Sequence, residues 1–229
     1  MSTTRLTALF LLLFTFAAGA AAQDCGRACL TGHVDAYFDA LAAGNARSFP
    51  FARNPKITLN GRETSIAQTF WDGAGETVYR WDIVNERLGD TGTEAVVLND
   101  DGSKTIMMLR LKVQEGAVTE VEIIRANEGD ADGLWGPDTL TEVSPFLTLT
   151  IREADQDSYY GLIAAAEGYW RAFQTNGTEL YHPADLFPDS RRYENGLEMT
   201  GLVRNGQYVS TSEGFDQGRF AARNLWDRR

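Results

Sequence analysis

The stretch TIMMLRLKVQEGAVTEVEIIRA, residues 105–126, decides the fold of this chain. Apolar and polar residues alternate on both sides of a short polar turn, and a period of two residues is typical of half-buried β-strands. Gly116 supplies the left-handed backbone conformation that a tight turn between such strands requires. The stretch therefore predicts an antiparallel β-hairpin with one apolar face.

The register of the hairpin follows from the positions of its charged residues. A three-residue loop that ends at Gly116 places Val113 opposite Ala117 and Arg110 opposite Glu120. One face of the hairpin then carries Met107, Leu109, Leu111, Val113, Ala117, Thr119, Val121 and Ile123. A two-residue loop would mix acidic side chains into that apolar face, so we expect the three-residue loop.

Helical and strand patterns precede this hairpin. Residues 29–44 carry apolar side chains at helical spacing, which predicts an amphipathic helix, and residues 65–71 favour one or two further helical turns. Short strands are predicted at 56–60, 78–86 and 93–99, and the first of them ends in an Asn60-Gly61 turn. This order of elements predicts an α+β domain in which helices pack on a curled antiparallel sheet.

A second unit of similar layout follows the hairpin. Residues 130–156 lack a clean period and predict an extended connection, whereas residues 159–173 predict another amphipathic helix. Tyr169 and Asn195-Gly196 repeat the order of Tyr37 and Asn60-Gly61 in the first unit. This order indicates an internal repeat, and coincidence between two amphipathic helices is the alternative.

These patterns divide the chain into a first domain at 23–128, a connection at 129–157 and a partial second repeat at 158–229 packed on the first domain. Within the repeat after Gly196, only residues 207–211 predict a strand, and residues 215–226 predict a helix. Because the repeat has few strands, we expect its exposed edge to be covered by the first domain or by a second copy of the chain in a homodimer.

The first 22 residues have the three parts of a secretory signal peptide. Arg5 is the lone positive charge, residues 6–18 form an apolar run, and residues 20–22 are small residues at the exit. The apolar run is shorter than a membrane-spanning helix requires. We therefore expect cleavage after Ala22 and a secreted or periplasmic product without a membrane anchor.

Charge and motifs exclude several classes of function. The chain has 32 acidic and 21 basic side chains and a formal net charge of −11, which is unsuited to neutralising the phosphates of a nucleic acid. It contains no Gly-x-Gly-x-x-Gly, phosphate-binding loop or Gly-x-Ser-x-Gly motif. We therefore expect neither a nucleic-acid partner nor a cofactor.

Cys25 and Cys29 are the only cysteines of the chain. Two thiols four residues apart at the start of a helix can meet across one turn, so an oxidising compartment predicts a disulfide between them. A redox-active pair is the weaker alternative, since the spacing is not that of a Cys-x-x-Cys motif. No metal site is predicted, because the chain has only two histidines.

The first unit resembles the nuclear transport factor 2-like fold, the cone-shaped barrel of ketosteroid isomerase, scytalone dehydratase and the SnoaL-like cyclases. The resemblance rests on the long first helix with its aromatic residue, the glycine that ends it, the strand that closes on Asn60-Gly61 and the curled sheet. The strings at 110–113, 119–122, 134–135 and 192–196 together resemble a secreted family without an assigned function that carries this fold.

The resemblance implies roles for particular residues. Tyr37 matches the first-helix tyrosine that in ketosteroid isomerase donates a hydrogen bond to a developing oxyanion. The position of that enzyme's general base holds Asn60, which accepts no proton and would orient the substrate instead. Substitute bases would be His33, Asp35, Asp72, Glu120 or Glu122, of which we take Asp35 as the catalytic candidate.

Two functions follow from this resemblance. One is a cofactor-free lyase, dehydratase or isomerase that acts on a small, largely apolar molecule, and the alternative is a non-catalytic protein that binds such a ligand. The candidate substrate-binding residues are His33, Trp71, Tyr79, Trp81, Arg110 and Glu122. Each has a structural alternative: the aromatic residues as core, Arg110 as a cross-strand ion pair, and His33 as a half-buried helix residue.

Overall fold

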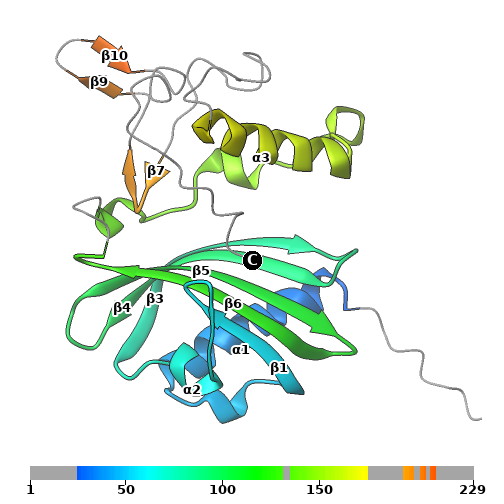
Figure 1. Cartoon of the computed structure of the whole chain (residues 1–229), viewed down its shortest axis with the longest axis vertical. Coiled ribbons are helices and arrows are strands. Elements are labelled where there is room, and N and C mark those ends of the chain that lie inside the picture. The colour runs from blue at the N-terminus through cyan, green and yellow to red at the C-terminus, as the bar shows by residue number, and fades with distance from the viewer. Residues whose placement is uncertain (1–24, 131–134, 175–192, 199–201, 205–206, 210–229) are drawn as a thin grey trace, which may run out of the picture.

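The computed structural model describes residues 25–130, 135–174, 193–198, 202–204 and 207–209 (Figure 1). The predicted signal peptide at 1–22 and the predicted helix at 215–226 lie outside these residues, so both stay predictions. Within the described ranges, no helix has the length and apolar character needed to cross a membrane.

A curved six-stranded sheet forms the centre of the molecule (Figure 1). Its strands are β1 (Phe51–Leu59), β2 (Arg62–Glu63), β3 (Ala74–Asn85), β4 (Asp90–Asn99), β5 (Lys104–Gln114) and β6 (Ala117–Asn127). Their order in the sheet is β2-β1-β6-β5-β4-β3, and β3 to β6 form an antiparallel meander as predicted. The sheet does not close, because β2 and β3 remain as its edges.

One pairing differs from the expected antiparallel sheet. β1 and β6 run parallel, with Ile57 opposite Val121 and Leu59 opposite Ile123. These strands are far apart in the sequence, and the local alternation of apolar residues carries no information on which distant strand lies beside which. The α+β architecture is confirmed, but the sheet is mixed and open.

Helix α1 (Arg27–Ala42) packs on one face of this sheet, which we call the inner face. The short α2 (Ile66–Thr69) and the 3₁₀ turn η1 (Ala46–Ser48) lie on the same side (Figure 1). The core between helix and sheet consists mainly of Leu30, Val34, Tyr37, Phe38 and Leu41 from α1 and of Met107, Leu109, Leu111, Val113, Val121 and Ile123 from the sheet. Burial of these apolar side chains is the main force that holds α1 on the sheet.

The predicted hairpin register is wrong. Gln114 pairs with Ala117, so the loop has two residues, Glu115 and Gly116, both with positive φ. The register then shifts by one residue at Thr119, which is a β-bulge. The bulge restores the burial pattern that a plain two-residue loop would have broken, and Arg110 lies opposite Glu122 instead of Glu120.

The chain after β6 covers part of the other face of the sheet, which we call the outer face. Three 3₁₀ turns follow: η2 (Pro137–Thr139), η3 (Pro145–Thr148) and η4 (Glu153–Asp155). Trp135, Leu140 and Val143 pack there against Tyr79, Val96 and Ile106. Within the extended connection predicted at 130–156, residues 135–156 thus contain three short turns, and the part at 135–143 packs on the outer face.

The second unit begins with α3 (Tyr159–Gln174), close to the predicted helix. Its strands pair as β7 (Tyr193–Glu194) with β8 (Leu197–Glu198) and β9 (Leu202–Arg204) with β10 (Gln207–Val209). Asn195 and Gly196 turn between β7 and β8 with φ of 46° and 83°, much as Asn60 and Gly61 turn between β1 and β2 with 49° and 76°. A helix followed by an Asn-Gly hairpin thus occurs in both units, and the exact division into domains stays a prediction.

Candidate functional site

Tyr37, the predicted hydrogen-bond donor, is fully buried in the core. Its hydroxyl donates a 3.1 Å hydrogen bond to the backbone carbonyl of Thr69, which is also buried. Burial raises the pKa of Tyr37 well above the ordinary value for a tyrosine. The hydroxyl therefore ties α2 to α1, and Tyr37 lines none of the surface depressions described below.

Asn60, at the position of the isomerase base, is occupied by backbone contacts. Its side-chain oxygen accepts a 2.9 Å hydrogen bond from the backbone N–H of Arg125, and its side-chain amide donates a 3.2 Å hydrogen bond to the Arg125 carbonyl. These two bonds extend the β1–β6 pairing beyond Leu59 and Ile123. The structure thus gives Asn60 a role in joining strands.

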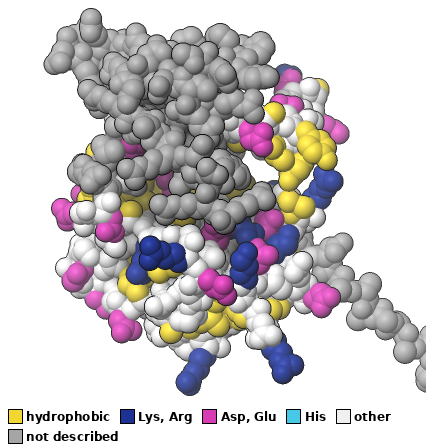
Figure 2. Space-filling model, viewed as in Figure 1, with side chains coloured by type: hydrophobic (Ala, Val, Ile, Leu, Met, Phe, Trp, Pro, Cys, Tyr) yellow, Lys and Arg dark blue, Asp and Glu magenta, His cyan; other side chains and the backbone are white. Residues whose placement is uncertain are grey.

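Arg110 and Glu122 lie on the outer face, away from Tyr37. The Arg110 guanidinium pairs with Asp90 at 3.0 Å and Glu122 at 3.2 Å, and also with Glu120. Basic and acidic side chains lie interspersed over the sheet in this view (Figure 2). Three carboxylates surround Arg110. Arg110 therefore forms cross-strand ion pairs, as predicted by the alternative to a substrate-binding role.

Tyr79 and Trp81 also belong to the outer face. The Tyr79 hydroxyl donates a 3.3 Å hydrogen bond to Glu94, and the ring packs under the connection after β6. Burial, together with the charge and hydrogen bond of Glu94, raises the pKa of Tyr79 to about 12. Trp81 packs partly buried against the same cluster, so neither aromatic side chain shares a site with Tyr37.

Asp35 lies at a third place. It forms a 2.7 Å ion pair with Arg80, which also pairs with Asp82 at 2.5 Å and lies 5.4 Å from the ring centre of Phe38. A depression of about 710 Å³ adjoins this group, with Asp39 among its lining residues. The carboxylate of Asp35 is therefore engaged with Arg80, away from Tyr37 and Asn60.

Trp71, a predicted site residue, and Arg125 line open space on the inner side of the sheet. Two depressions, of about 440 and 420 Å³, share these two residues, and together we call them the Trp71 groove. The first is lined by Leu59, Arg62 and Gln68 among others, and the second by Asn99, Asp100 and Asn127 among others.

The indole of Trp71 is held in place by a polar network. Its N–H donates a 3.0 Å hydrogen bond to Asn99, whose amide donates a 3.1 Å hydrogen bond to Thr105. The Thr105 hydroxyl donates in turn to Asn127 at 2.8 Å. Since these residues come from the ends of β4, β5 and β6, the sheet itself fixes the orientation of the ring.

The Arg125 guanidinium lies over this ring, 5.0 Å from its centre. In the described part of the chain, the guanidinium has no carboxylate partner, unlike Arg80 and Arg110. The first depression has two positive charges, Arg62 and Arg125, and one negative charge, Glu63. Asp72, Asp100 and Asp101 line the second depression. The groove therefore has a basic and an acidic part, with a flat aromatic surface between them.

Arg125 was not among the residues predicted for the site. Val121, Ile123 and Arg125 follow one another at a spacing of two, which places Arg125 on the inner face at the end of an apolar strand. The sequence therefore holds a charged residue at a position where the alternation of a strand places core side chains, and this pattern could have indicated Arg125. Of the candidate residues named from the sequence, Trp71 and the possible base Asp72 line the groove, and the Asn60 side chain bonds to the backbone of Arg125.

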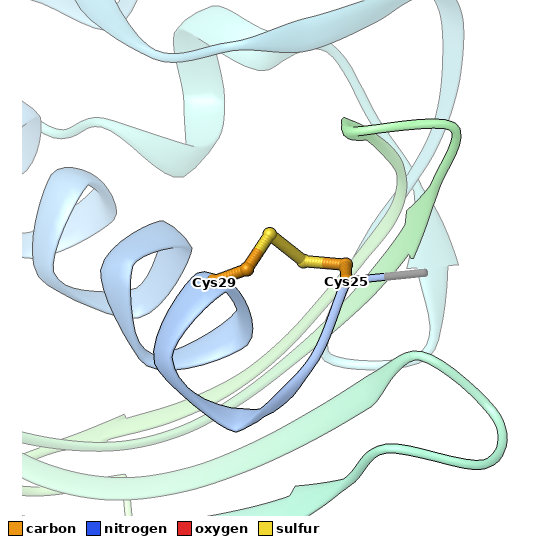
Figure 3. Close-up of a disulfide and its surroundings, with 2 residues drawn as sticks. All are labelled: Cys25 and Cys29. Atoms are coloured by element: carbon orange, nitrogen blue, oxygen red, sulfur yellow. A yellow bond between two sulfur atoms is a disulfide. The ribbon is translucent and has the colours of Figure 1, made fainter. Parts of the chain in front are cut away.

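The predicted disulfide between Cys25 and Cys29 is confirmed, with Cα atoms 5.2 Å apart (Figure 3). The His33 side chain lies beside it, and the possible ligand atoms of the three residues lie within 4.8 Å of one another. Partial burial lowers the pKa of His33. The spacing of four residues from Cys25 to Cys29 and again from Cys29 to His33 is the signal in the sequence that indicates this cluster.

The chain matches no protein-family model and no curated protein. Among solved structures, it is similar to a candidate polyketide cyclase from Xanthomonas campestris, with 21% identity and a TM-score of 0.36 over 43% of this chain and 90% of that one. It is also similar to a candidate ketosteroid isomerase from Kribbella flavida, with 15% identity and a TM-score of 0.36 over 57% and 96% of the two chains. A third is an NTF2-like protein of unknown function from Shewanella baltica, with 9% identity and a TM-score of 0.30 over 43% and 92%. The fold assignment itself rests on the sheet order and the helix packing.

Proposed function

We propose that the Trp71 groove binds a small organic anion that carries a flat, apolar ring. The observation that carries this proposal is the Arg125 guanidinium, stacked over Trp71 and without a carboxylate partner in the described ranges. In a chain with a net charge of −11, an unpaired guanidinium beside an aromatic ring is a natural anion-binding group. A carboxylate on the ligand would pair with Arg125, and its ring would pack near Trp71.

The dimensions of the groove support this ligand class. Depressions of about 440 and 420 Å³ fall within the size range of small-molecule sites. The polar network behind Trp71 fixes the ring before a ligand arrives, so binding does not require ordering of this side chain. The acidic part of the groove disfavours ligands with a second negative charge at that end.

The arrangement favours binding without chemistry over the enzyme alternative. The hydroxyl of Tyr37 is committed to Thr69, and the amide of Asn60 is committed to the backbone of Arg125. Neither group faces the groove as an oxyanion donor or a substrate-orienting group would. A cofactor-free lyase, dehydratase or isomerase reaction therefore stays a prediction, and ligand capture is the proposed function.

We also propose that the protein acts outside the cytoplasm, in the secreted or periplasmic location predicted from residues 1–22. The disulfide between Cys25 and Cys29 supports this location, since disulfides persist in oxidising compartments. The homodimer stays a prediction, which light scattering on the chain without residues 1–22 would test.

Titration calorimetry with 2-naphthoate and with the neutral 2-naphthamide tests the proposed ligand class. We expect the carboxylate to bind at least about tenfold more tightly, since the neutral amide has no negative charge to pair with Arg125 and offers only its carbonyl oxygen as an acceptor. Arg125→Gln should remove this preference, whereas Arg53→Gln, an exposed arginine on β1, should keep it. Equal binding of the two probes, or equal behaviour of the two variants, would overturn the proposal.

A further inference from the structure

Cys25, Cys29 and His33 form a compact set of metal-ligating side chains outside the Trp71 groove. Cys29 and His33 lie in consecutive turns of α1, and Cys25 lies just before the helix. Their ligand atoms lie within 4.8 Å of one another, although a disulfide joins the two sulfurs (Figure 3). Two cysteine sulfurs and an imidazole nitrogen are the ligands that zinc sites in proteins use most.

The scaffold of this cluster does not depend on the disulfide. The opposite side of α1 is held on the sheet by Leu30, Val34 and Tyr37, all of which are fully buried. Cys29 and His33 therefore keep their spacing when the disulfide opens, and only Cys25 has to move. Cys29 is exposed, so a reductant in solution can reach the bond.

We propose that the reduced protein binds one Zn²⁺ ion through Cys25, Cys29 and His33, and that the disulfide closes this site in the oxidised protein. Three protein ligands leave the fourth tetrahedral position to a water molecule. Because the sulfurs are metal ligands only as thiolates, the same two atoms serve either the disulfide or the metal.

The chemistry of the switch balances with a phosphine as reductant. The phosphine gives two electrons to the disulfide and becomes a phosphine oxide with the oxygen of one water molecule. The two protons of that water molecule are transferred to the two sulfur atoms, which become thiols. When Zn²⁺ binds, both thiols release their protons, and neutral His33 supplies a lone pair without a proton change.

Zinc binding to the oxidised and the phosphine-reduced chain, measured anaerobically by competition with a chromophoric chelator, tests this proposal. We expect one Zn²⁺ per reduced chain and none per oxidised chain. Co²⁺ in place of Zn²⁺ should give thiolate charge-transfer absorption in the reduced chain alone. Circular dichroism under both conditions checks that α1 remains folded.

The variants separate this site from other metal-binding groups. Cys29→Ser should abolish zinc binding by the reduced chain, and His33→Asn should weaken it by about tenfold or more. Replacing a residue that only orients a ligand already lowers metal affinity by about tenfold, and replacing the ligand itself should lower it at least as much. His182→Asn, at the only other histidine, is the matched control and should bind like the wild type. Equal zinc binding in both redox states, no binding by a folded reduced chain, or unchanged affinity in His33→Asn would each overturn the proposal.

Discussion

The hydroxyl of Tyr37 and the carbonyl of Thr69 form a hydrogen bond inside the core, at 3.1 Å. This bond joins two helices that the sequence separates by 32 positions. It also explains why a tyrosine, instead of a phenylalanine, stands among the aromatic rings of Phe38, Phe49 and Phe70.

Tyr37→Phe should lower the free energy of unfolding by about 1 kcal/mol, because the buried Thr69 carbonyl loses its partner while the ring still fills its space. Urea denaturation followed by circular dichroism measures this change. Naphthoate binding should stay unchanged, since Tyr37 does not line the groove. If Tyr37→Phe loses naphthoate binding but keeps the stability of the wild type, Tyr37 belongs to the ligand site, as the resemblance implied.

Asn60→Ala should lower the free energy of unfolding by about 2 kcal/mol, since it removes both bonds to the Arg125 backbone and leaves a non-glycine residue at a φ of 49°. Asn60→Gly should fall between wild type and Asn60→Ala, because glycine tolerates this φ but makes no such bonds. Asn54→Ala, at an exposed position of β1, is the control for urea denaturation. If all three variants unfold like the wild type, the strand-joining role of Asn60 is wrong.

The double variant Cys25→Ala/Cys29→Ala should be less stable than the oxidised wild type by about 2 kcal/mol, the loop-closure entropy of so short a loop. With a phosphine reductant and a metal chelator in the buffer, the two proteins should have nearly equal stability. Thermal unfolding under both conditions measures the difference. A difference that persists in the reduced, metal-free state would show that the cysteines stabilise α1 by packing instead.

Tyr79 should make the protein sensitive to alkaline pH. The pKa of Tyr79 rises from 10.0 to about 12 on folding, so the neutral phenol stabilises the folded state. This contribution is fully present below pH 10 and is lost as the pH rises from 10 through 12, where the unfolded state has already released the proton. Urea midpoints across that range should therefore fall less steeply for Tyr79→Phe than for wild type, and Tyr160→Phe, at an exposed tyrosine, should follow the wild type.

Local patterns predicted most of the fold. The strands predicted at 105–113 and 117–126 agree with β5 and β6 to within one residue at each end, because alternation is a property of neighbouring residues. The bulge at Thr119 escaped prediction, since one extra residue lets a two-residue loop satisfy the same burial pattern that seemed to require three. The disulfide was predictable from the spacing of the two cysteines together with the expected oxidising compartment, because both cysteines belong to one turn of the chain.

The site was harder to predict than the fold. Tyr37, Asn60 and Asp35 were grouped by resemblance, but the local contacts of each residue place them in three different environments. Arg125 was overlooked because its importance depends on Trp71, which reaches the groove from a different part of the chain. Contacts of this kind arise only when the sheet brings distant strands together.

The parallel pairing of β1 with β6 has a consequence for how the chain reaches its native state. Asn60 and Arg125, at the end of this pairing, are 65 residues apart in the sequence, whereas β3 to β6 are joined by short turns. Pairings between distant segments form slowly, since a long loop must close first. The meander should therefore assemble early and β1 should dock last, so that during folding the β6 edge is open to pairing with other chains.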